Sequence, residues 1–149
     1  MTGARRILVL GDLLHATAGL TERMIEDVGA WRRGFAGEVF VVAGNHDRRL
    51  DVVAERWSLT ILGEKYEEGP FTFTHEPRED SGRVVWCGHV HPVFRVRSAS
   101  DSLRLPCFVI GERRVILPAF NDFTGGAAVR PGKGDVLYAV AERDVIRVG

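Results

Sequence analysis

Three polar residues with metal-ligand chemistry, Asn45, His46 and Asp47, directly follow a short apolar run and a glycine. The run 41–43 is typical of a buried strand, and Gly44 lets the backbone leave such a strand sharply. Open α/β sheets build their sites at the carboxyl ends of strands. Asparagine offers a neutral oxygen, histidine an imidazole nitrogen, and aspartate a carboxylate that can orient the histidine. Taken alone, the stretch is equally typical of an Asx turn that caps a helix.

The same arrangement, a predicted strand followed by residues that can bind a metal, recurs at three other places. These residues are Asp12 after the run 6–10, His75 after 71–74, and His89 with His91 after 83–87. Four of the five histidines therefore fall at strand ends, which scattered core or surface histidines would not do. Aspartate, asparagine and histidine without cysteine form a mixed oxygen and nitrogen set. Such a set favours Mn, Fe, Co or Zn over Ca or Mg.

His89 and His91 would point to opposite faces if their strand continued through them. A turn is therefore needed for both to face one site, and Gly88 and Pro92 stand where that turn is required. A second glycine-rich segment, Phe120–Gly126, joins two later strands. We expect Gly125 and Gly126 to take positive φ there, and the aromatic residues of the segment could stack on a base.

The elements that must position these residues divide into two halves. Strands at 6–10, 38–43 and 59–62 alternate with helices at 21–35 and 50–57, a βαβαβ pattern that predicts a parallel sheet. Strands then follow one another without helices, at 71–74, 83–87, 93–97, 103–110, 113–117, 136–141 and 145–148. This second run predicts antiparallel pairing in a sheet packed on the first. Pro106 predicts an edge or a bulge within its strand.

Composition sets broad bounds on the protein. The chain has 149 residues, which suggests one domain spanning 1–149. Lys+Arg and Asp+Glu both total 20, so the net charge argues neither for nor against nucleic acid. We find no membrane-spanning apolar run and no secretion signal pattern, so we expect a cytoplasmic protein without membrane contact. Cys87 and Cys107 sit in apolar runs without C-x-x-C spacing and are predicted to be buried thiols.

The four motifs together resemble those of the calcineurin-like metallophosphoesterases. They are Gly11-Asp12-Leu13-Leu14-His15, Gly44-Asn45-His46-Asp47, His75-Glu76-Pro77 and Gly88-His89-Val90-His91-Pro92. Segments 105–108, 117–120 and 123–126 further resemble the bacterial metallophosphoesterases associated with DNA ligase and the DNA damage response. The resemblance covers essentially the whole chain. It implies an α/β fold, a two-sheet sandwich of mixed sheets flanked by helices as in metallophosphatases, and a two-metal centre.

The resemblance also implies a role for each residue. Asp12 would bridge both metal ions, Asn45, His75 and His89 would complete one metal site, and His91 would bind the other metal. His46 would contact the phosphate and help the leaving oxygen, with Asp47 holding its ring. Two further residues lie beside this set as candidate substrate contacts, Arg48 and His15. For these two, a solvated helix start and a packed loop histidine are at least as typical.

One family motif is absent from the sequence. Such enzymes carry an Asp-x-His motif on a strand before the Gly-Asp motif, but only ten residues precede Gly11 and none is Asp or His. The resemblance then implies one full metal site, one half site, and a chain that is N-terminally truncated relative to the family. The strand at 6–10 would lose one partner strand within its parallel sheet, which leaves oligomerisation through that edge open.

The leading interpretation is a hydrolase, a metal-dependent phosphodiesterase or endonuclease acting on DNA, in which water attacks phosphorus directly. The second is a small-molecule phosphatase or nucleotidase on the same centre, and the preferred substrate length separates these two. The third is a degenerate, non-catalytic metal-binding protein that docks to DNA ligase or other repair proteins. The missing motif favours the third interpretation, and metal content together with turnover would test it.

Overall fold

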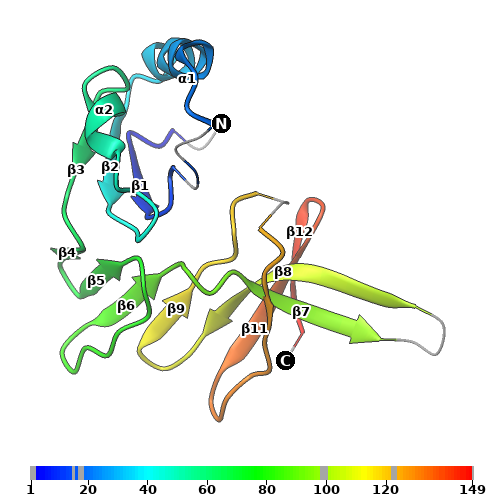
Figure 1. Cartoon of the computed structure of the whole chain (residues 1–149). Helices are drawn as coiled ribbons and strands as arrows, with labels where there is room; N and C mark the ends of the chain where they lie inside the picture. The colour runs from blue at the N-terminus through cyan, green and yellow to red at the C-terminus, as the bar shows by residue number, and fades with distance from the viewer. Residues whose placement is uncertain (1–2, 15, 17–18, 98–100, 122–123, 149) are drawn as a thin grey trace. The chain divides into compact units, whose positions relative to one another are not determined.

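The computed structural model describes residues 3–14, 16, 19–97, 101–121 and 124–148 (Figure 1). The chain divides into two compact units, Met1–Tyr66 and Glu67–Gly149. No helix among the described residues is long and apolar enough to cross a membrane.

The first unit has the predicted βαβαβ order. Its elements are β1 (Arg6–Leu10), α1 (Glu22–Gly34), β2 (Glu38–Val42), α2 (Leu50–Ala54) and β3 (Leu59–Ile61). The three strands form a parallel sheet in the order β1-β2-β3, which confirms the parallel pairing expected from the alternation of strands and helices. Thr21 caps α1, because its side-chain oxygen accepts a hydrogen bond from the Met24 N–H at 3.2 Å.

The core of the first unit joins both helices to the middle strand. Its fully buried members are Leu14, Ile25, Val41, Leu50, Val53 and Trp57. The Trp57 indole N–H donates to the Ile25 carbonyl at 2.9 Å, so the largest core side chain is also satisfied as a donor. This packing fixes the sheet whose strand ends carry Asp12 and the 44–47 turn.

The larger sheet has nine strands, most of them in the second unit. They are β4 (Lys65–Glu68), β5 (Phe71–Thr74), β6 (Val84–Cys87), β7 (Pro92–Arg97), β8 (Ser102–Ile110), β9 (Arg114–Ile116), β10 (Ala127–Ala128), β11 (Val136–Ala141) and β12 (Asp144–Arg147). Their order is β10-β7-β8-β9-β6-β5-β4, with β11 pairing both β8 and β12. The strands β4 and β10 were not predicted from the sequence.

The pairing within this sheet corrects the expectation of antiparallel neighbours. β7–β8, β8–β9, β8–β11 and β11–β12 are antiparallel, but β5–β6, β6–β9 and β10–β7 are parallel. The prediction assumed that only a helix can return the chain for a parallel pair. Here the irregular segment 75–83 returns it between β5 and β6, and the β7–β8 hairpin does so between β6 and β9.

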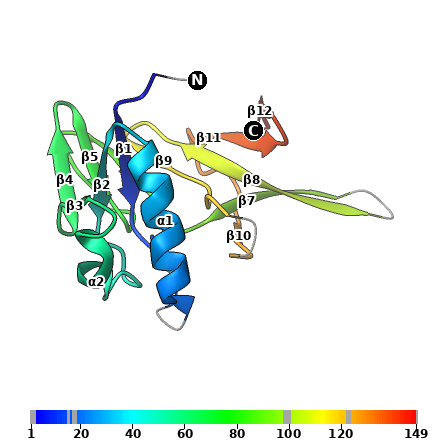
Figure 2. The same cartoon turned by 90° about the horizontal axis from the view of Figure 1, so that it is seen from above.

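A long two-stranded ribbon made of β7 and the first half of β8 projects from the rest of this sheet (Figure 2). β8 pairs with β7 through Ser102–Pro106 and with β11 from Cys107 onward, so Pro106 lies where β8 changes its partner. Cys87 and Cys107 are both free and buried, as predicted.

Candidate functional site

Asp12 and the turn after β2 meet at the carboxyl ends of two neighbouring parallel strands. Asp12 follows β1 with a φ of 54°, a backbone conformation that is uncommon for residues other than glycine. Its Oδ1 atom accepts a hydrogen bond from the His46 backbone N–H at 3.1 Å. A Cβ atom on Gly44 would collide with the Asp12 carboxylate and backbone nitrogen. The glycine therefore lets the two loops approach each other closely.

The buried side chain of Asp47 links the loop after β1 to the turn after β2. The side chain is only 6% exposed, and its two oxygens accept backbone hydrogen bonds at 2.9 Å from Leu14 and from Gly44. The alternative reading as a helix cap is wrong, because α2 begins after Arg49 without any side-chain cap. The structure thus assigns Asp47 a bracing contact that its sequence position did not predict. Its role in orienting the His46 ring stays a prediction.

The other candidates of the first unit lie on the surface. Asn45 and His46 occupy an exposed turn, which the Asp47 N–H closes by donating to the Gly44 carbonyl at 3.3 Å. Arg48 is also exposed, in the turn before α2. The remaining candidate, His15, lies outside the described residues.

His75 and His89 form the clearest side-chain pair of the second unit. The Nδ1 atom of His89 lies 3.0 Å from the Nε2 atom of His75, and the two rings are nearly perpendicular, at 83°. His75 follows β5 and is only 4% exposed, whereas His89 follows β6 and is exposed. The parallel neighbours β5 and β6 bring their carboxyl ends together, and the Gly88 N–H donates to the His75 carbonyl at 3.0 Å. The unpredicted parallel pairing therefore creates this pair.

The chain turns between β6 and β7 as the sequence predicts. His89 and His91 have φ values of 62° and 48°, so neither residue continues a strand. Positive φ values at polar residues cost conformational energy and concentrate at functional sites. Asp12, His89 and His91 account for three of the five non-glycine residues in this conformation among those described.

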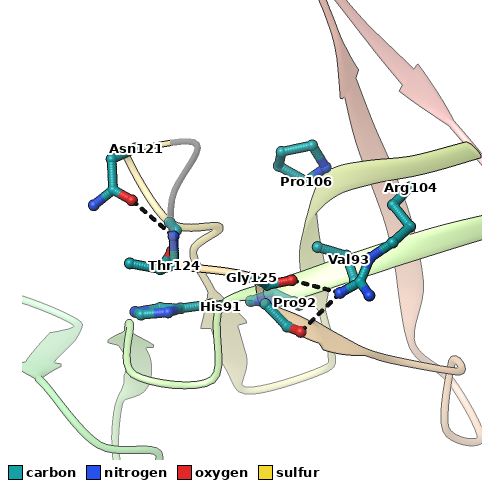
Figure 3. A pocket seen from close by; sticks show the side chains of 10 residues that line it. His91, Pro92, Val93, Arg104, Pro106, Asn121, Thr124 and Gly125 are labelled. Carbon is teal, nitrogen blue, oxygen red and sulfur yellow. Dashed lines mark hydrogen bonds between the residues drawn. The ribbon is translucent and has the colours of Figure 1, made fainter.

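His91 also borders a pocket of about 210 Å³ that the sequence did not predict (Figure 3). Arg104 forms one side of the pocket, and its guanidinium donates to the carbonyls of Gly125 and Gly126. On the other side, the Asn121 Oδ1 atom accepts a hydrogen bond from the Thr124 N–H at 3.2 Å. Both glycines have a φ of 63°, as predicted. The sequence pointed to this loop through its two glycines and its aromatic residues, but not to the pocket. Of those aromatic residues, Phe120 is exposed and Phe123 lies outside the described residues.

The structure thus joins the candidates within each unit. Asp12, His46 and Asp47 share hydrogen-bonded loops in the first unit, and His75 contacts His89 in the second. Across the described residues, no group of three or more His, Cys, Asp or Glu side chains that could hold a metal ion is found.

Comparison with known proteins finds similarity among solved structures. No protein-family model matches the chain, and no curated protein sequence matches it. Among solved structures, the chain is similar to the crystal structure of the Pseudomonas putida nuclease MPE. The identity is 36% and the TM-score 0.84, over 97% of this chain and 71% of the nuclease chain. The chain belongs to the family of this nuclease.

Membership of this nuclease family bears on the whole chain. Because the match covers 97% of the residues, it extends over both units and over the strand ends of each. It also agrees with the expected α/β class, since the described chain combines helices with a parallel and a mixed sheet.

Proposed function

We propose that this chain hydrolyses phosphodiester bonds in DNA, as a calcineurin-like metallophosphoesterase with a divalent transition metal as cofactor. The observation that carries the proposal is the 36% identity to a nuclease over nearly the whole chain. The motifs at the strand ends add the chemistry, because they supply the oxygen and nitrogen donors that such ions bind.

The described residues fit a metal of this class. Two nitrogens bound to one ion at about 2.0–2.1 Å lie about 3.0–3.4 Å apart at the usual ligand angles, and those of His75 and His89 are 3.0 Å apart. In the first unit, Gly44 leaves room for the Asp12 carboxylate where a Cβ atom would fill it. We propose that Asp12, Asn45, His75 and His89 hold one ion. His91 and Asp12 form the half site for a second.

When bound, an ion of this class polarises the phosphoryl group and makes water a nucleophile near neutral pH. His46 lies on an exposed turn whose backbone is anchored to Asp12, and we propose that its ring contacts a bound phosphate. As an imidazolium, His46 donates the proton that the leaving oxygen needs when its bond to phosphorus breaks. Such proton transfer contributes about 10²–10⁴-fold to the rate. Asp47 keeps the turn in place through Leu14 and Gly44.

The test combines a small phosphodiester with an oligonucleotide. We expect manganese-dependent hydrolysis of bis(p-nitrophenyl) phosphate and of single-stranded DNA. His46→Ala should lower kcat by about 10²–10⁴-fold and leave the metal content nearly intact. Loss of the metal in His46→Ala would overturn the roles assigned within 44–47. Faster turnover of phosphomonoesters and nucleotides than of DNA would favour the small-molecule phosphatase. Metal binding without any turnover would favour the non-catalytic protein that docks to DNA ligase or other repair proteins.

A further inference from the structure

Three arginines lie on one face of the ribbon formed by β7 and the first half of β8. The register places Arg95 directly opposite Arg104, and Arg97 opposite Ser102. Residues opposite each other share a face of a sheet, and alternate residues of a strand point the same way. Arg95, Arg97 and Arg104 therefore occupy the same face, which we call the arginine face.

The charge of this face is not balanced by carboxylates in the described part of the chain. All three arginines are exposed, and none takes part in an ion pair found among the described residues. Arg104 donates to two backbone carbonyls, which leaves its positive charge in place. Like charges directly opposite each other destabilise a strand pair. Repulsion between Arg95 and Arg104 therefore lowers the stability of the ribbon. The requirements of folding do not account for this pair.

The two faces of the ribbon differ sharply in character. The face opposite the arginines carries the cross-strand pairs Phe94–Leu105 and Val96–Leu103. Val96 and Leu103 are 44% and 55% exposed, so even the apolar face is open to solvent near the tip. The arginines are therefore segregated to one side of the ribbon. The ribbon itself projects from the rest of its sheet (Figure 1). A general solubility role would not require that segregation.

The arginine face is continuous with the pocket beside His91. Val93 and Pro106 are opposite each other on that face, and both line the pocket together with Arg104. His91 borders the same pocket, with Gly125 between it and the Arg104 guanidinium (Figure 3). A chain of phosphates lying along the ribbon would thus end beside a residue of the proposed metal centre.

We propose that the arginine face binds the phosphate backbone of a nucleic-acid strand and guides that strand towards His91. The inference rests on the proposed function. It narrows the substrate of that function to a polymer, which has phosphates on both sides of the cleaved bond. Guanidinium groups bind phosphate with two parallel hydrogen bonds. Arg95 and Arg97 are two residues apart, about 6.6 Å along a strand, so they can meet successive phosphates of an extended strand. Backbone contacts of this kind position a nucleic acid without reading its sequence.

The test measures binding of a fluorescent single-stranded oligonucleotide by anisotropy at several salt concentrations. We expect Arg95→Gln with Arg97→Gln to raise Kd about tenfold or more, and to reduce the slope of log K against log salt by about 1.4, or about 0.7 for each lost contact. Arg95→Lys with Arg97→Lys should retain most of the slope. The matched control is Arg143→Gln with Arg147→Gln, which removes two exposed charges from the β11–β12 hairpin and should change neither quantity.

Two results would overturn the inference. One is a wild-type chain that does not bind the oligonucleotide. The other is a loss of binding in the Arg143→Gln, Arg147→Gln control that equals the loss in the Arg95→Gln, Arg97→Gln variant. Thermal unfolding checks the fold, and the glutamine variant should melt no lower than wild type because a like-charge contact is relieved. Binding is measured without hydrolysis, so a chain that binds through the ribbon but never hydrolyses bis(p-nitrophenyl) phosphate would disprove the proposed function only. Conversely, if Arg95→Gln with Arg97→Gln slows oligonucleotide cleavage no more than cleavage of the small diester, only the inference is disproved.

Discussion

The Nδ1 atom of His89 lies 3.0 Å from the Nε2 atom of His75, although the two histidines follow different strands. At this distance one ring can donate a hydrogen bond to the other, and both nitrogens can instead bind one ion. Because β5 and β6 are parallel neighbours, the loops that follow their carboxyl ends bring the two histidines together. Two nitrogens of the kind that metal ions bind therefore lie close together in the second unit.

We expect His75→Ala and His89→Ala each to weaken manganese binding by more than about tenfold, because removal of a ligand costs more than the 10–100-fold loss typical of an outer-shell partner. Isothermal titration calorimetry measures the change directly. Glu76→Gln is the matched control, since Glu76 is the exposed neighbour of His75. Equal effects of all three substitutions would contradict the assignment of the histidines as ligands.

The proposed ligand set also predicts the amount of bound metal. One full set beside a half set should give about one Mn, Fe, Co or Zn per chain after gentle purification, as measured by elemental analysis. Chelation by EDTA should lower Tm, because a ligand that binds only the folded state stabilises it. Absence of any transition metal, together with a Tm that EDTA does not change, would count against the metal centre.

Much of the first unit could be predicted from its sequence, because its signals are local. The helix predicted at 21–35 is α1 (Glu22–Gly34), which Thr21 caps and whose apolar residues are regularly spaced. Its place between β1 and β2 leaves parallel pairing as the only simple arrangement. The second unit depends on long-range pairing that no local pattern specifies. The parallel β5–β6 pair was missed because no helix separates these strands.

In the candidate site, too, local features could be predicted from the sequence and long-range contacts could not. Residue types at strand ends identified the candidates, and the turn at 89–91 followed from Gly88 and Pro92. The contacts between them did not follow, because Asp47 reaches Leu14 across 33 residues and Arg104 reaches Gly125 across 21. Such contacts depend on how whole strands align, which the separate motifs do not encode.

The buried carboxylate of Asp47 predicts a large loss of stability on truncation. Asp47→Ala would leave two backbone N–H groups, of Leu14 and Gly44, without their acceptor. Each buried unsatisfied group costs about 1–3 kcal/mol, so we expect the free energy of unfolding to fall by about 2–5 kcal/mol in urea denaturation. Thr21→Ala, which removes only the cap of α1, should cost about 0.5–2 kcal/mol. A smaller loss for Asp47→Ala than for Thr21→Ala would show that Asp47 does not brace the loops.

Gly44 provides a test of the loop contact that needs no polar group to be removed. In Gly44→Ala the new methyl group would collide with the Asp12 carboxylate and its backbone nitrogen. We expect Asp12 to shift, so that manganese affinity falls while the helical circular dichroism signal stays near wild type. Gly63→Ala is not a matched control, because Gly63 has a positive φ, but Gly34→Ala is, since a Cβ there meets nothing within 4 Å. Unchanged metal affinity in Gly44→Ala would show that Asp12 is not a ligand.

The two cysteines predict how stability depends on alkaline pH. Burial raises the pKa of both the Cys87 and the Cys107 thiol to about 11, and the Cys87 thiol also donates to the Val115 carbonyl at 3.8 Å. An unfolded thiol has a pKa of about 8.5, so the folded chain binds these protons more tightly than the unfolded chain. The contribution of the two thiols to stability is therefore fully present below about pH 8.5 and is lost as the pH rises towards 11.

We expect the free energy of unfolding to fall over that range, and to fall less steeply in the Cys87→Ala, Cys107→Ala variant. The difference between the two slopes is the quantity that counts, because it isolates the contribution of the two thiols. Parallel curves for the two proteins would show that the thiols do not govern this loss, and rapid reaction of the native chain with a thiol reagent at pH 8 would show that they are not buried.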